Sequence, residues 1–167
     1  MKRAIVLALS VIPALVVAAP TVLAQDEGPP NGGAPEVVSG TIIVNPGDPN
    51  WPGTCTFPLQ LDLSGKAKTI ELPDARFILT SPGLDVTVTN LDNGEQATFN
   101  ITGASHTRPL ENGNVETVMT GRNFAIDPVV GTTVVIGRYT FVFDAEGNLV
   151  QHQMGDGQRI DVCELLS

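Results

Sequence analysis

The two histidines, His106 and His152, are the side chains in this 167-residue chain best suited to acid–base or metal chemistry. Imidazole titrates near neutral pH and is the commonest metal ligand, so either residue could act with a nearby carboxylate as a base or a ligand. His152 alternates with Val150 and Met154, which indicates a strand. No HExxH or other close ligand spacing is present, so a surface or hydrogen-bonded strand histidine is the favoured interpretation.

Ser105 is the candidate nucleophile, because it precedes His106 in the segment GASHT at positions 103–107. A nucleophile elbow places serine between two glycines on a sharp strand-to-helix turn. Here Thr107 stands where the second glycine belongs, and no helix is expected after it. Adjacency in sequence does not place a hydroxyl in hydrogen-bond geometry with an imidazole. We therefore predict no catalytic residue, and an enzyme is the less favoured class.

Two turns rich in acidic and amide side chains could bind Ca²⁺ at the weak affinities of extracellular loops. Their residues are Asp92, Asn93 and Glu95 in one turn, and Asp144, Glu146 and Asn148 in the other. Gly147 does not occupy the glycine position of an EF-hand loop. Turn preferences explain these residues without a metal, so we expect no metal and no cofactor, and Ca²⁺ binding stays open.

Trp51 is the only tryptophan and lies in a polar loop rich in proline and glycine, from Asn45 to Gly53. An exposed indole on such a loop could stack on a sugar ring or anchor a protein partner. The alternative, which we favour, is a plug that closes one end of the core near Cys55. The loop is nevertheless the best candidate for a partner-binding site, with a cell-wall glycan, another extracellular glycan or a protein as the partner.

Cys55 and Cys163 are the only cysteines, and we predict that they form a disulfide. Their wide separation does not fit a zinc knuckle or a C-x-x-C redox centre. Such a bond would join the first core strand to the last, so the two ends of the fold are expected to be neighbours.

The first 24 residues have the three parts of a secretory signal peptide: Lys2 and Arg3, an apolar run, and a small-residue cleavage signature ending at Ala24. We therefore predict a protein secreted to the extracellular space, without membrane attachment after cleavage. Loss of Lys2 and Arg3 takes the formal net charge from −9 to −11. The few remaining basic residues exclude a nucleic-acid-binding track and disfavour anionic membranes.

Residues 25–35 contain no apolar side chain larger than alanine and are rich in proline and glycine, which predicts a disordered spacer. A single domain is then expected over residues 36–167. After residue 24, Val, Ile and Thr number 37 and Ala and Leu number 18, which favours strands over helices. Apolar and polar residues alternate at 59–64, 84–89 and 96–101, as in antiparallel strands with one buried face.

Turn signals at Asn93-Gly94, Asn112-Gly113 and 144–147 separate these alternating runs. We predict an all-β domain, an antiparallel β-sandwich of about 9–11 short strands, with a β-barrel as the alternative. The expected strands are 37–44, 55–63, 68–72, 75–80, 84–91, 95–102, 115–120, 132–136, 138–144, 148–154 and 158–163.

The signal peptide and several short segments together resemble a group of small secreted actinobacterial proteins with one cysteine near each end of the domain. The segments are Cys55-Thr56-Phe57-Pro58, Ser81-Pro82-Gly83 before Val86-Thr87-Val88-Thr89-Asn90, Gly121-Arg122-Asn123 and Asp161-Val162-Cys163-Glu164-Leu165-Leu166. The resemblance covers roughly residues 54 to 166. It implies the same fold and location, and it brings no activity, cofactor or site residue.

Three functional hypotheses follow from these features. The first and favoured one is a non-enzymatic extracellular binding or structural module. The second is a secreted hydrolase or metal-dependent enzyme that uses His106 or His152, which requires the histidines and a carboxylate to share one cleft. The third is a carrier of an apolar small ligand, which requires a cavity of at least about 300 Å³.

Overall fold

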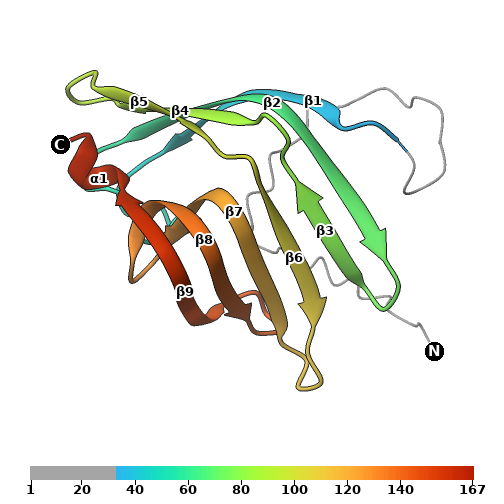
Figure 1. Ribbon diagram of the computed structural model, residues 1–167. Coiled ribbons are helices and arrows are strands. Elements are labelled where there is room, and N and C mark those ends of the chain that lie inside the picture. Colours follow the sequence, from blue (N-terminus) through green and yellow to red (C-terminus); the bar gives the residue numbers. More distant parts are fainter. Residues whose placement is uncertain (1–32) are drawn as a thin grey trace, which may run out of the picture.

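The computed structural model describes residues 33–167, so the predicted signal peptide (1–24) and most of the predicted spacer (25–35) lie outside the described residues. The described part holds nine strands and one short helix (Figure 1). The strands are β1 (Glu36–Val44), β2 (Leu59–Leu72), β3 (Arg76–Thr80), β4 (Asp85–Asn90), β5 (Gln96–Asn100), β6 (Gly103–Pro109), β7 (Val115–Asp127), β8 (Gly131–Phe143) and β9 (Leu149–Asp161). The helix is α1 (Val162–Leu165).

The strands form one open antiparallel sheet in the order β5-β4-β2-β3-β6-β7-β8-β9, with β1 also paired to β2. β4 pairs with the first half of β2 and β3 with its second half, so β2 belongs to both layers. β1, β4 and β5 complete one layer, and β3 and β6 to β9 complete the other (Figure 1). The all-β class is confirmed, the arrangement is compatible with a β-sandwich, and the sheet does not close into a barrel.

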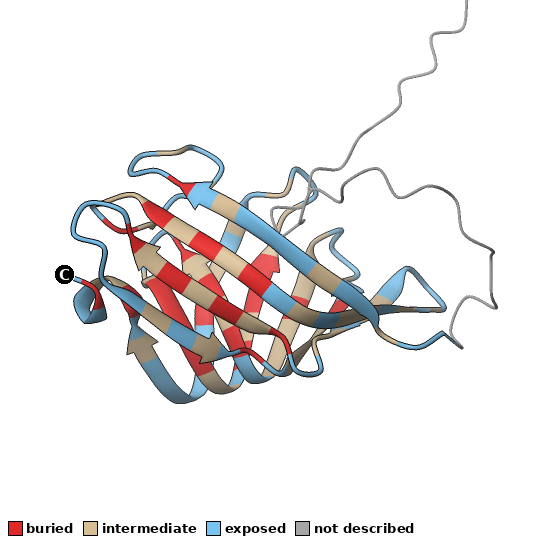
Figure 2. Ribbon diagram, turned by 90° about the horizontal axis from the view of Figure 1, so that it is seen from above, coloured by how far each residue is buried: buried red, intermediate tan, exposed pale blue. Residues whose placement is uncertain are grey.

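The core lies between the two layers, and its residues come from alternate positions of the strands (Figure 2). Leu59, Leu61 and Leu63 of β2 are buried, while the residues between them are partly exposed. The fully buried Val134 packs against this cluster from the other layer. The alternation in the sequence therefore predicts the buried face of these strands correctly.

Several predicted strand boundaries are wrong. β6 was not expected, because the polar segment from Gly103 to Pro109 lacks an apolar alternation. Residues 55–58 precede β2, and residues 162–163, predicted as the end of a strand, lie in α1, where the Asp161 side chain accepts a hydrogen bond from the backbone N–H of Glu164. Six predicted strands merge into three, because glycines that look like strand ends lie inside the continuous strands β2, β8 and β9.

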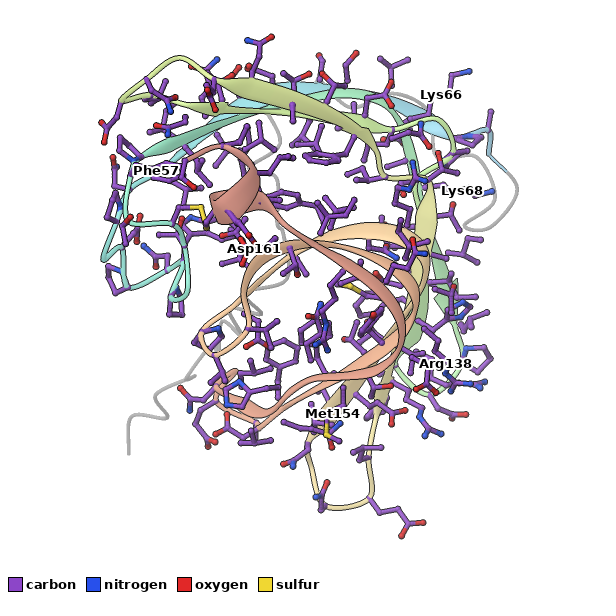
Figure 3. The ribbon with its side chains drawn as sticks, turned by 60° about the vertical axis from the view of Figure 1, so that its left-hand side comes forward. Phe57, Lys66, Lys68, Arg138, Met154 and Asp161 are labelled. Carbon is purple, nitrogen blue, oxygen red and sulfur yellow. A yellow bond between two sulfur atoms is a disulfide. The ribbon has the colours of Figure 1, made fainter. Side chains whose placement is uncertain are left out.

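A row of four paired glycines crosses four neighbouring strands. The pairs along the row are Gly103 with Gly121, Gly121 with Gly137, and Gly137 with Gly157. A Cβ on Gly137 would lie 2.9 Å from the Cα of Gly157, and the φ of Gly137 is +139°. Side chains there would hold the strands apart, so the glycines allow the sheet to bend at this row. β9 accordingly curves from Met154 round to Asp161 in Figure 3.

Candidate functional site

A disulfide joins Cys55 to Cys163, as predicted, with the two Cα atoms 5.3 Å apart. Cys55 lies in the loop before β2 and Cys163 lies in α1, so the bond fixes the end of the chain to the start of the core. Beside it, the side-chain amides of Asn90 and Asn93 donate hydrogen bonds to the carbonyl oxygen of Leu166, at 2.8 and 3.1 Å. The loop, the helix and the β4–β5 turn therefore form one crosslinked end of the molecule.

Trp51 lies at this same end and is partly buried against the hydrophobic core. Its backbone N–H donates to the carbonyl oxygen of Asp48, and the Asp48 carboxylate accepts a hydrogen bond from the backbone N–H of Asn50. The packing of the indole fits the plug interpretation, and it leaves less of the ring free for a ligand. Binding of a partner by this loop stays a prediction.

His152 lies beside the carboxylate of Asp127, which is not among the predicted site residues. Its Nδ1 is 3.3 Å from Oδ1 of Asp127, and the Asp127 side chain is fully buried. Oδ1 of Asp127 also accepts hydrogen bonds from the backbone N–H groups of Val129 and Val130, and Oδ2 accepts one from that of Gln153. Asp127 thus links the β7–β8 turn to β9. The Asp-Pro pair that starts this turn is the only sequence signal for it.

Burial raises the pKa of Asp127 by less than its hydrogen bonds and His152 lower it. The three backbone N–H donors and the charge of His152 therefore bring its pKa below the ordinary value. Nδ1 of His152 and Oε1 of Gln153 are buried without a hydrogen-bond partner. A catalytic Asp–His pair orients its imidazole through a hydrogen bond that Nδ1 of His152 does not make here, and among residues 33–167 no contact places a third reacting group beside the pair.

Replacement of Asp127 by asparagine is expected to lower the free energy of unfolding by about 2–4 kcal/mol at pH 7. Asparagine keeps one acceptor oxygen. Its side-chain NH₂ group takes the place of the other carboxylate oxygen and must then face a backbone N–H group, which is also a donor. Because the pKa of Asp127 is lowered in the fold, its stabilisation is complete above about pH 4 and is lost as the pH falls further. Urea unfolding at pH 7 and pH 3 should show a difference that shrinks in acid, whereas exposed Asp156→Asn should change little at either pH.

The other candidate catalytic residues do not join this cluster. His106 lies on β6 opposite Val118, and that row continues through Thr140 to Met154 on β9. The row crosses three strand spacings of about 4.8 Å each, so His106 lies roughly 14 Å from Met154 on β9. Ser105 lies on a strand opposite Leu79 and Met119, and not on an elbow. The described residues therefore do not bring the two histidines into one cleft.

The two acidic turns are held by their own hydrogen bonds. The Asp144 carboxylate accepts from the backbone N–H groups of Glu146 and Asn148 and from the Asn148 side chain. The Asn148 side chain is the largest of the effects that lower the pKa of Asp144. Oδ1 of Asn93 accepts from the backbone N–H of Glu95 in the same way. Across residues 33–167, no three His, Cys, Asp or Glu side chains gather closely enough to hold a metal ion.

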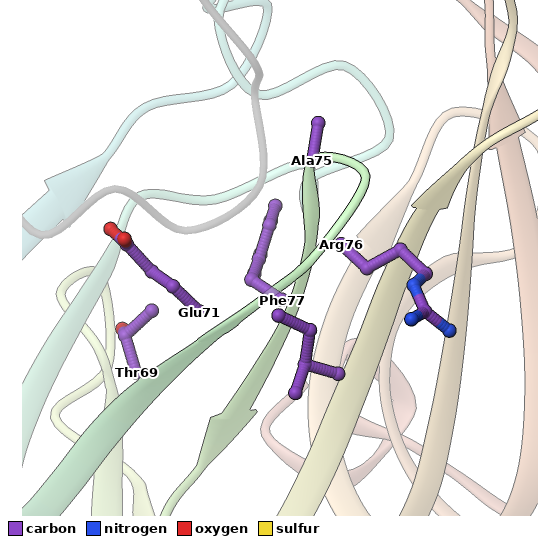
Figure 4. Close-up of a pocket in the computed structure, with 6 residues that line it drawn as sticks. Thr69, Glu71, Ala75, Arg76 and Phe77 are labelled. Carbon is purple, nitrogen blue, oxygen red and sulfur yellow. The ribbon is translucent and has the colours of Figure 1, made fainter. Parts of the chain in front are cut away.

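A hollow of about 320 Å³ lies at the tip of the β2–β3 hairpin (Figure 4). Its lining is Thr69, Glu71, Leu72, Ala75, Arg76 and Phe77. Most of these side chains are exposed, and the lining includes both a carboxylate and a guanidinium. The hollow is therefore not the apolar cavity that a carrier of a small apolar ligand requires.

The edge strand β1 is the surface best suited to a partner. β2 is the only strand paired with it in the described part of the chain, along all nine residues and without a register shift. Its sole charged residue is its first, Glu36, and it contains no lysine and no proline. Val37 and Ile43 are 79% and 45% exposed. A long edge strand with a single charge at its end and free backbone groups is a template for another strand.

The other two outer strands have features that oppose such pairing. β5 has only five residues and follows the acidic turn at Asp92 and Glu95. β9 is longer, but its pairing with β8 is interrupted by a register shift, and it includes Asp156 and Arg159. Short length, bulges and charges protect sheet edges from other chains. Among the outer strands, β1 therefore lacks these protections.

Comparison with family models, curated proteins and solved structures finds no match to this chain. No helix among residues 33–167 is long and apolar enough to cross a membrane.

Proposed function

We propose that this protein is a secreted, non-enzymatic binding module that takes up an extended polypeptide by strand addition at β1. The observation that carries the proposal is the unprotected edge of β1, which offers backbone hydrogen bonds along its whole length. In strand addition the main chain supplies affinity, and alternate side chains supply selectivity. The signal sequence and the disulfide support an extracellular location for this contact.

The scaffold behind β1 fits this role because its inner residues are anchored. Val44 is fully buried, and Val38 and Ile42 pack against the core, so the edge is held in an extended conformation before a partner arrives. A preformed strand loses little conformational entropy on binding. The outer face presents Val37 and Ile43, which favour β-branched or aromatic residues in the partner strand.

Random nonapeptides displayed on phage and selected at nanomolar protein concentration test the proposal. We expect enrichment of extended sequences rich in Val, Ile and Thr, and loss of their binding to the double variant Val37→Glu/Ile43→Glu. The matched control is Val129→Glu/Val150→Glu, which places the same charges on two residues that are 70% and 53% exposed outside β1. Failure to enrich such peptides, or equal binding to both variants, would refute strand addition at β1.

A further inference from the structure

The sequence of β1 is chemically symmetric about Gly40. Three residues on each side of it, Val37-Val38-Ser39 and Thr41-Ile42-Ile43, carry matching side chains in reverse order. The outer two positions on each side are β-branched aliphatic residues, and the inner position carries a hydroxyl group. When a strand pairs antiparallel with its own copy around a central residue, each residue faces its mirror position, so this symmetry matches side chains of one kind across the pair.

Pairing about Gly40 matches side chains of one kind on each face. Val37 would face the copy's Ile43, Val38 its Ile42, and Ser39 its Thr41. Aliphatic β-branched pairs and hydroxyl pairs are among the favourable cross-strand combinations. Directly opposite residues in this register lie on the same face, so Val38 and Ile42 stay on the core side in both chains. Gly40 faces itself, and a Cβ built on it meets no atom within 4 Å, so the centre of the strand is open.

The register about Gly40 also keeps the acidic residues of β1 and β2 in the two chains away from one another. Glu36 would face the copy's Val44, so no charged residue lies directly opposite the single charge of the strand. Asp62, on the neighbouring strand, accepts a 2.5 Å hydrogen bond from Thr41, which the register places beside the copy's Ser39. The two Asp62 carboxylates would be three strand spacings apart, about 14 Å, which exceeds the Debye length of about 8 Å at physiological salt.

We infer that the partner strand at β1 is β1 of a second copy, in a two-fold antiparallel pair centred on Gly40. The result is an isologous dimer in which the layers of the two chains that contain β1 join into one continuous sheet. This inference rests on the proposed strand addition and names the occupant. One strand pair buries less than the roughly 1,200–2,000 Å² of a standard interface, so association is expected in the micromolar range.

Two variants that differ by a single residue test the register. In Val37→Glu/Ile43→Glu, two glutamates face each other at two symmetric places in the dimer. In Val37→Lys/Ile43→Glu, each lysine faces a glutamate of the copy. Val37 pairs with Lys66 within its own chain, so glutamate at position 37 suits the monomer at least as well as lysine does. A difference in dimerisation between the two variants therefore reports the contact between chains.

Sedimentation equilibrium of the secreted chain from about 1 μM to 1 mM measures the dissociation constant. We expect a concentration-dependent dimer for the wild type, a dissociation constant raised roughly a hundredfold in the Glu/Glu variant, and a value near that of the wild type in the Lys/Glu variant. A wild-type monomer at 1 mM, or equal dimerisation of the two variants, overturns the inference. A monomer that still binds selected peptides through β1 would leave the proposed function standing and remove only the second copy.

Oxidative crosslinking locates the axis. Gly40→Cys should form a disulfide between two chains, because directly opposite Cα atoms in antiparallel strands are about 4.5–5.5 Å apart. Thr41→Cys is the matched control, since residue 41 faces position 39 of the copy and not itself. Equal crosslinking of the two variants under the same conditions would contradict an axis at Gly40.

Discussion

Loss of the Cys55–Cys163 disulfide is expected to lower the free energy of unfolding by about 4–5 kcal/mol, which corresponds to roughly 10–20 °C in melting temperature. The bond closes a loop with a sequence separation of 108, so the unfolded chain gains much freedom when it is removed. The bond also holds α1, whose first residue, Val162, and the residue after it, Leu166, are buried in the core.

Thermal unfolding of Cys55→Ser/Cys163→Ser, compared with the oxidised wild type, measures this effect. The serine pair keeps the size of the side chains and removes the thiols, so no new disulfide replaces the old one. A melting temperature within about 2 °C of the wild type would show that the loop-closure argument fails here.

Replacement of Gly137 by alanine is expected to cost at least about 3 kcal/mol of folding free energy. The added methyl group would collide with the carbonyl oxygen of Asp156 and would lie 2.9 Å from the Cα of Gly157. Relief of that collision requires β8 and β9 to separate at the bend. The φ of +139° adds strain for any residue with a side chain.

Gly40→Ala is the matched control for Gly137→Ala, because both glycines lie in strands and a Cβ at residue 40 meets no atom within 4 Å. Urea unfolding of the two variants should differ by several kcal/mol, with the control close to the wild type. Similar stabilities would mean that the sheet bends without help from the row of glycines.

Local patterns in the sequence predict local features of this fold well. Alternation identifies the buried faces of β2 and β4, and the even cysteine count identifies the disulfide, because both depend on residues near one another or on simple pairing. Glycines make strand ends hard to predict, because a glycine can either end a strand or allow a continuous strand to bend. Gly65 and Gly137 lie inside strands, where they look like breaks in the sequence.

The contacts that define the candidate sites depend on topology, so the sequence alone does not predict them. Asp127 meets Gln153 only because the bent sheet returns β9 to the β7–β8 turn. The symmetry of β1 is visible in the sequence, but it gains meaning only once the sheet order places β1 at an edge. The sequence predicts Trp51 as a candidate binding residue, whereas its packing against the core depends on contacts between distant segments that only the fold reveals.

Amide hydrogen exchange along β1, measured at low micromolar and at millimolar concentration, tests the central claim most directly. In a lone edge strand, alternate N–H groups point away from β2 and exchange quickly, while those facing β2 are protected. We predict that the fast set slows by about tenfold or more at high concentration in the wild type and stays fast in Val37→Glu/Ile43→Glu. If the N–H groups that point away from β2 exchange equally fast at both concentrations in the wild type, β1 does not pair with a second copy.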